Sequence, residues 1–149
     1  MSYDPDNPPR LKVANSILAA VRTLTSIFPK AIQVTLNKAD ISRGAAYWFI
    51  LTPAGWTPTR LDAHDKLTAW RFRGELAVAF AEYNTRTEKF IKAAELVRNK
   101  LETPFALTGI KLNPPVIVTG EDLTQDIPGA TPNWIVQTYV ITVNTFVST

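Results

Sequence analysis

Three neighbouring residues, Asp62, His64 and Asp65, are the side chains of this sequence best suited to chemistry. Two carboxylates beside an imidazole could bind a metal ion or transfer a proton. However, His64 is the only histidine among the 149 residues, and the surrounding segment contains two prolines and a glycine. We therefore interpret the aspartates as solvated loop or turn residues, and we predict neither a catalytic nor a metal site here.

Other catalytic groups are missing from the sequence. It contains no cysteine, which excludes cysteine nucleophiles, thiolate zinc sites and iron–sulfur clusters. None of its serines lies in a G-x-S-x-G motif, and it has neither a Walker loop nor a G-x-G-x-x-G motif. We predict that the protein is not an enzyme and that it uses no cofactor.

A pair of arginines suggests a binding surface. Arg71 and Arg73 alternate with two aromatic residues, so both arginines lie on one face of an extended chain. If neighbouring strands supply an aromatic such as Trp48 or Tyr83, that face could bind nucleic acid or another ligand. The simpler interpretation places the aromatics in the core and the arginines in water. A small nucleic-acid or ligand-binding module is therefore kept as an alternative.

Composition is that of a globular protein, with 46% hydrophobic and 19% charged residues. The formal net charge of +3 comes from 16 basic and 13 acidic residues without a block of like charge, so it demands no anionic partner. The first ten residues are acidic and proline-rich, unlike a secretory signal, and no run reaches the ~18 apolar residues that span a bilayer. We predict a flexible arm over 1–10, a single domain over 11–149, no membrane contact and synthesis in a cytoplasm.

Hydrophobic periodicity predicts the elements of the first half. Apolar residues three and four apart predict a helix over 11–28, and alternation predicts a strand over 31–36. The continuous apolar run 46–52 predicts a second, buried strand. The segment 53–66 contains two prolines and a glycine, and we expect a long loop there.

The second half is predicted to contain three strands and one helix. In the strand 70–83 the large apolar residues share one parity, and the charged and small residues share the other. A helical stripe predicts a helix ending near Leu101, and strands are expected over 116–119 and 134–147 with a loop over 120–133. The order of elements predicts an α+β fold, a mainly antiparallel sheet of about four to five strands with two helices packed on one face.

Aromatic residues are abundant, with four tryptophans, seven phenylalanines and four tyrosines. Trp56, Trp134 and Phe105 lie in or beside predicted loops, where such residues either cover a core or anchor a subunit interface. An assembling protein would explain this abundance. The interface candidates, chosen on probable edges and loops, are Trp56, Arg60, Arg71, Arg73, Trp134 and Tyr139.

The order of parts resembles the tail-terminator (tail-completion) proteins of long-tailed bacteriophages. The similar parts are the N-terminal amphipathic helix, an early aromatic strand, the arginine–glycine strand 71–78 (RFRGELAV) and a helix of the type at 87–101. A proline-led strand at 115–119 and a terminal strand opening on Trp134 complete the resemblance. The sequence departs from the family pattern in the long proline-rich segment after Thr52 and in a turn near residue 84 without glycine.

The resemblance implies a structural virion protein without catalysis. A ring, expected to be a hexamer, would cap the tail tube, stop its polymerisation and join it to the head connector. The implied partners are further copies of the chain, the tail tube protein and connector or neck proteins, while DNA passes through the bore without specific binding. The implied location is the tail or neck of the virion, after assembly in the host cytoplasm. Another neck protein, a head–tail adaptor, is the alternative in the same setting.

Overall fold

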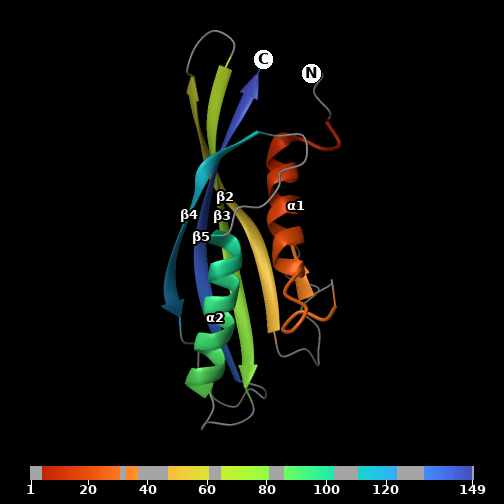
Figure 1. The fold of residues 1–149 in the computed structure, drawn as a ribbon, viewed down its shortest axis with the longest axis vertical. Coiled ribbons are helices and arrows are strands. Elements are labelled where there is room, and N and C mark those ends of the chain that lie inside the picture. The colour runs from red at the N-terminus through yellow and green to blue at the C-terminus, as the bar shows by residue number, and fades with distance from the viewer. Residues whose placement is uncertain are drawn as a thin grey trace.

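The computed structural model describes residues 5–30, 33–36, 47–60, 65–80, 86–102, 111–123 and 133–148. Within these residues the chain forms two helices and five strands (Figure 1). Their order is α1 (Pro9–Arg22), β1 (Val34–Thr35), β2 (Tyr47–Arg60), β3 (Asp65–Phe80), α2 (Arg86–Glu102), β4 (Lys111–Leu123) and β5 (Asn133–Ser148).

The strands form one mixed sheet in the order β1-β2-β3-β5-β4. The two-residue β1 pairs in parallel with β2, whereas the pairs among the four long strands are all antiparallel. Both helices pack on the same face of the sheet. The predicted α+β fold, a mainly antiparallel sheet with two helices on one face, is confirmed.

One hydrophobic core lies between the helices and the sheet. Its sheet residues have the alternating spacing of a single strand face, as the parity of the sequence predicts for 70–83 and 134–147. The fully or almost fully buried core residues of the long strands are Phe49, Leu51, Phe72, Leu76, Val78, Tyr139, Ile141 and Val143. The helices contribute their own apolar stripes, which include Ile17, Val21, Val97 and Leu101.

The first helix is shorter than the predicted range 11–28. It begins at Pro9, whose missing N–H costs nothing in the first turn, so the last two residues of the expected arm are helical. It ends at Arg22 because Thr23 binds the carbonyl of Ala20 with both its hydroxyl, at 2.6 Å, and its N–H, at 3.2 Å. Phe28 lies beyond this end in a series of turns and is still buried in the core.

The predicted loop over 53–66 is wrong for its described residues, because β2 continues to Arg60, β3 begins at Asp65, and the two strands pair. Its two prolines are compatible with a strand since β1 pairs only with Phe49 and Ile50, which leaves the outer edge of β2 without a described partner. Proline fits such an edge when its nitrogen faces away from the ladder. A bulge between Pro53 and Gly55 provides the extra bend.

The strands at the two edges of the sheet also differ from their predicted ranges. Of the strand expected over 31–36, the described residues 33–36 contain only β1, which is held by Arg22 Nη2 donating to the Val34 carbonyl at 2.9 Å. At the other edge, β4 is longer than 116–119 and includes part of the predicted loop over 120–133. Its ladder with β5 is interrupted between Asn113 and Ile117, where two consecutive prolines lack the N–H of a regular strand.

Candidate assembly interface

The hairpin formed by β2 and β3 carries an exposed aromatic pair. Trp56 is 54% exposed, more than any other large hydrophobic residue in the described part of the chain. The strand register places it directly opposite Trp70, and the two ring centroids are 6.4 Å apart. Trp70 is fixed in turn, because its indole N–H donates to Thr145 Oγ1 at 2.9 Å. Trp56 is therefore a supported apolar ring, a typical anchor for a protein partner.

This aromatic pair continues the core face of the sheet. Trp70 has the parity of the core residue Phe72, and it packs partly buried against the core. Trp56 shares that face because the bulge at Ala54 changes the parity of β2, so that an even-numbered residue takes the side occupied earlier by Phe49. Figure 1 shows the hairpin end of the sheet extending past both helices. The exposure of Trp56 follows from this extension.

Arg71 lies on the opposite face of the same hairpin. Its Nη1 donates to Thr57 Oγ1 at 2.8 Å. Its guanidinium also passes close to Gly55, where an added Cβ would lie 3.1 Å from Nη2. Gly55 has a φ of 132°, which side-chain-bearing residues rarely adopt, so glycine provides both the bend and the space. The hairpin thus holds a partly exposed cation in a fixed position.

Arg73 and Trp48 share the sheet face of Arg71 but do not form a stacking site. The Arg73 Nε lies 3.4 Å from Glu75 Oε1, an exposed ion pair. Trp48 is only 1% exposed, so no base could stack on its ring without rearrangement. Tyr83, the other aromatic considered for nucleic-acid binding, lies outside the described residues. In its described part, this face therefore lacks the accessible ring that the binding-module alternative requires.

Tyr139 serves the core and presents no surface to a partner. It is 3% exposed, and its hydroxyl donates to the Ala94 carbonyl of α2 at 2.7 Å. Its position on an edge was expected from the sequence, but β5 is an inner strand with neighbours on both sides. The hydroxyl explains why a tyrosine can occupy this core position, because its polar end reaches a helix carbonyl.

The remaining candidates lie at opposite ends of the sheet. Arg60 is at the hairpin end, paired with Lys66, whereas Trp134 opens β5 opposite Ala79. The structure therefore places Trp56, Arg60 and Arg71 on the same hairpin, with Trp56 and Arg71 on opposite faces, Arg73 further along β3, and Trp134 apart from them. Of the residues considered for chemistry, Asp65 begins β3, while 61–64 and Phe105 lie outside the described residues.

Exposed apolar residues on other elements were missed by the sequence reasoning. Ile91 is 52% exposed on α2, and Val140 is 40% exposed on the sheet face opposite the helices. Val140 could have been found, because it is apolar at a parity that the pattern of β5 assigns away from the core. It lies opposite Arg73, so an apolar and a cationic side chain adjoin each other there.

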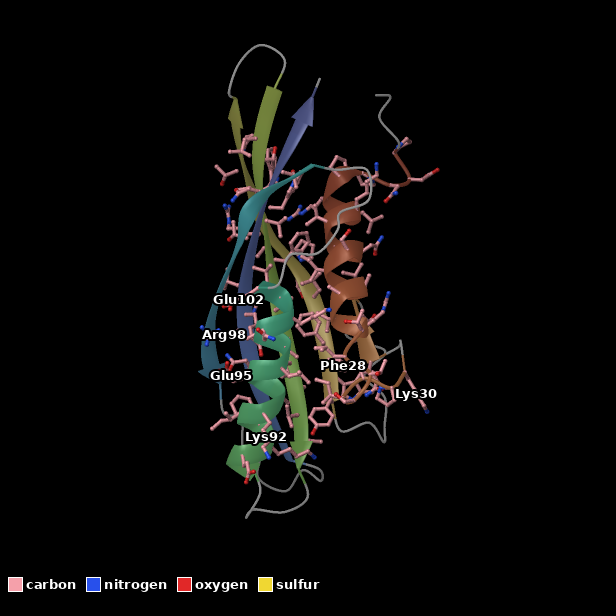
Figure 2. All side chains as sticks on the ribbon, viewed as in Figure 1. Phe28, Lys30, Lys92, Glu95, Arg98 and Glu102 are labelled. Carbon is pink, nitrogen blue, oxygen red and sulfur yellow. The ribbon has the colours of Figure 1, made fainter. Side chains whose placement is uncertain are left out.

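The outer side of α2 is occupied by ion pairs (Figure 2). Lys92 Nζ lies 2.7 Å from Glu88 Oε1, and its hydrogen bond lowers the pKa of Glu88. Arg98 contacts Glu102 at 3.1 Å and Glu95 at 3.6 Å. Pairs one helical turn apart on an exposed helix are typical of a solvated surface and contribute little to stability. This side of α2 is therefore a weaker interface candidate than the hairpin.

Within the described ranges, no three histidine, cysteine, aspartate or glutamate side chains come together as metal ligands. Neither α1 nor α2 has the length and apolar character that crossing a membrane requires.

Comparison with known proteins adds no relative. The sequence matches no protein-family model, and no curated protein is similar to it.

Proposed function

We propose that this protein is a structural virion protein of the tail-terminator type. It forms a ring that caps the tail tube, stops tube polymerisation and joins the tube to the head connector. The order of elements supports the proposal, and one observation carries it: the hairpin presents Trp56, half exposed, on a support formed by Trp70 and Thr145. Such an anchor is typical of surfaces that bind another protein.

The two edges of the sheet support a ring in particular. A closed ring requires head-to-tail contacts, so each subunit must present two different surfaces to its neighbours. The edge formed by β1 and β2 contains Pro53, Pro58 and a bulge, whereas β4 continues without proline from Ile117 to Leu123. Edges that differ in this way are suited to unlike contacts.

Loss of the protein from a phage that encodes it tests the proposal. Without a terminator, tube polymerisation is not stopped, so electron micrographs of lysates should show tails longer than those of the wild type. Tails of normal length that fail to join heads would instead identify a head–tail adaptor. Normal tails joined to heads would contradict both assignments. Complementation with the intact gene is the control.

A further inference from the structure

We propose that the sheet face opposite α1 and α2 (the outer face) of one copy binds the exposed side of α2 of a second copy, as the contact that repeats around the ring. In this contact Val140 packs against Ile91 of the second copy, and Arg71 binds its Glu95. This inference rests on the proposed function, since it names the two different surfaces that a ring requires.

The outer face is accessible at three neighbouring residues. The strand register places Val140 directly opposite Arg73, and Arg71 lies two residues away along β3 on the same face. Val140 is 40% exposed, the Arg73 side chain is 50% exposed, and Arg71 is partly exposed. Further along the same face Trp48 and Ile50 are buried, so the accessible patch lies toward the hairpin.

This patch holds a cation that no carboxylate neutralises. Among the side chains that the structure describes on the outer face, the charged ones are Arg71, Arg73 and Glu75. Arg73 and Glu75 form an ion pair at 3.4 Å and balance each other. Within the described residues Arg71 donates to the neutral hydroxyl of Thr57, which fixes the guanidinium and leaves its charge unpaired.

The exposed side of α2 carries the complementary groups. Ile91, Glu95, Arg98 and Glu102 follow one another at spacings of four, three and four residues, so they form one stripe along the helix (the α2 stripe; Figure 2). Ile91 is 52% exposed. Arg98 lies 3.1 Å from Glu102 and 3.6 Å from Glu95, so two carboxylates share one cation. The more distant Glu95 can therefore accept a further donor.

The apolar and charged groups have similar spacing on the two surfaces. Val140 and Arg71 are diagonal neighbours on adjacent strands, about 7–8 Å apart. Ile91 and Glu95, one helical turn apart, are separated by about 5–6 Å. The reach of an arginine side chain covers this difference. Burial of the apolar pair favours association, and the opposite charges fix the register of the two surfaces.

The positions of the two surfaces allow the contact to repeat. Both helices pack on one face of the sheet, so the α2 stripe and the outer face lie on different sides of the molecule. Each copy then keeps one surface free for the next neighbour until the ring closes. Contacts between like surfaces would instead bring two unpaired arginines together, or two stripes with an excess of carboxylates, and like charges repel.

Charge reversal tests the pair formed by Arg71 and Glu95. Arg71→Glu and Glu95→Arg are made singly and together in the full chain. The control is Lys30→Glu, because Lys30 is exposed in the turns after α1, far from the hairpin and from the α2 stripe (Figure 2). Circular dichroism and thermal unfolding check the fold of each variant. Sedimentation velocity over a series of concentrations up to tens of micromolar gives the dissociation constant.

We expect each single reversal to raise the dissociation constant at least about tenfold, because like charges then face each other. The double variant should return to within about threefold of the wild type, since its ion pair is restored with the charges exchanged. Lys30→Glu should assemble like the wild type.

The apolar part of the contact has a matched control on the same helix. Ile91→Ala should also raise the dissociation constant several-fold. Leu96 is likewise exposed, at 36%, but it lies about 140° around the helix from Ile91. Leu96→Ala should therefore leave assembly unchanged.

Three results would overturn the contact: wild-type protein that stays monomeric, single reversals that assemble like the wild type, or a folded double variant that stays as dissociated as the single ones. None of these results decides the proposed function, which is tested by tail length. Overlong tails together with any of the three would leave the terminator in place and remove only this contact. Tails of normal length with the expected pattern of reversal and rescue would keep the contact and reject the terminator.

Discussion

Gly74 shows how closely a single core position is fitted. A Cβ added there would lie 2.7 Å from Phe49 Cζ and 3.4 Å from Ile141 Cδ1. The first distance is shorter than any relaxed contact, so the Phe49 ring or the strand would have to move. Glycine at this point of β3 is therefore required by the approach of the ring, since no unusual backbone angle is involved.

Gly74→Ala should lower the free energy of unfolding by about 1–3 kcal/mol, because it overfills a packed core. Urea denaturation measures the change. Phe49→Leu is the companion substitution, because it removes the ring that the new methyl meets. The double variant should be more stable than the sum of the two single effects implies. Strict additivity would show that the clash is relieved elsewhere.

Tyr139→Phe isolates one hydrogen bond between β5 and α2. The substitution removes the hydroxyl that donates to the Ala94 carbonyl and keeps the ring in the core. We expect a loss of about 1 kcal/mol in the free energy of unfolding, the usual net value of such a bond. Chemical denaturation and native mass spectrometry should be run together. Unchanged stability with altered assembly would return Tyr139 to the interface.

At the scale of elements, α2 contains two leucines in contrasting positions. Leu101 is fully buried in the core, whereas Leu96 is 36% exposed. Leu101→Ala should cost about 2–5 kcal/mol of unfolding free energy through lost burial and the cavity left behind. Leu96→Ala, which changes helix propensity by the same amount, should cost less than about 1 kcal/mol. Thermal unfolding compares the two, and equal losses would contradict the packing of α2.

The sequence pattern predicts strands correctly where one face of the strand is buried. The buried faces of β3 and β5 can be predicted from the sequence, because one face packs against the helices and large apolar residues therefore recur at every second position. The length of β2 was not readable, because Pro53 and Pro58 indicate a loop unless an unpaired edge accommodates them. In the described part of the chain β1 pairs only with Phe49 and Ile50, and the pattern of β2 itself does not reveal this short partner.

Candidate interface residues were harder to predict than strands. The prolines around Trp56 predict a loop, but Trp56 lies in a strand, and a bulge determines which face it occupies. The sequence alone places Tyr139 on a probable edge, because the order of strands in the sheet cannot be read from their order in the chain. β5 lies between β3 and β4, and Tyr139 lies on the face of β5 that packs against the helices.

At the scale of the whole molecule, the exposed residues of the hairpin can contribute to assembly without being needed for the folded core. The core between the helices and the sheet does not include Trp56, whose ring lies beside that of Trp70, tilted by 37° with 6.4 Å between the ring centroids. A residue in this position can contribute strongly to a contact between copies while contributing little to the fold. Trp48 is the opposite case, since it is fully buried and belongs to the folded chain alone.

Trp56→Ala should therefore abolish assembly while lowering the free energy of unfolding by only about 1–2 kcal/mol, because half of the ring already faces water. Trp48→Phe is the control, which should lower stability and leave assembly intact, since no partner reaches that ring. Sedimentation velocity gives the oligomer size, and urea denaturation gives the stability of each variant. If Trp56→Ala lowers stability like a core substitution and still assembles, then Trp56 covers the core, and the contact between copies lies elsewhere.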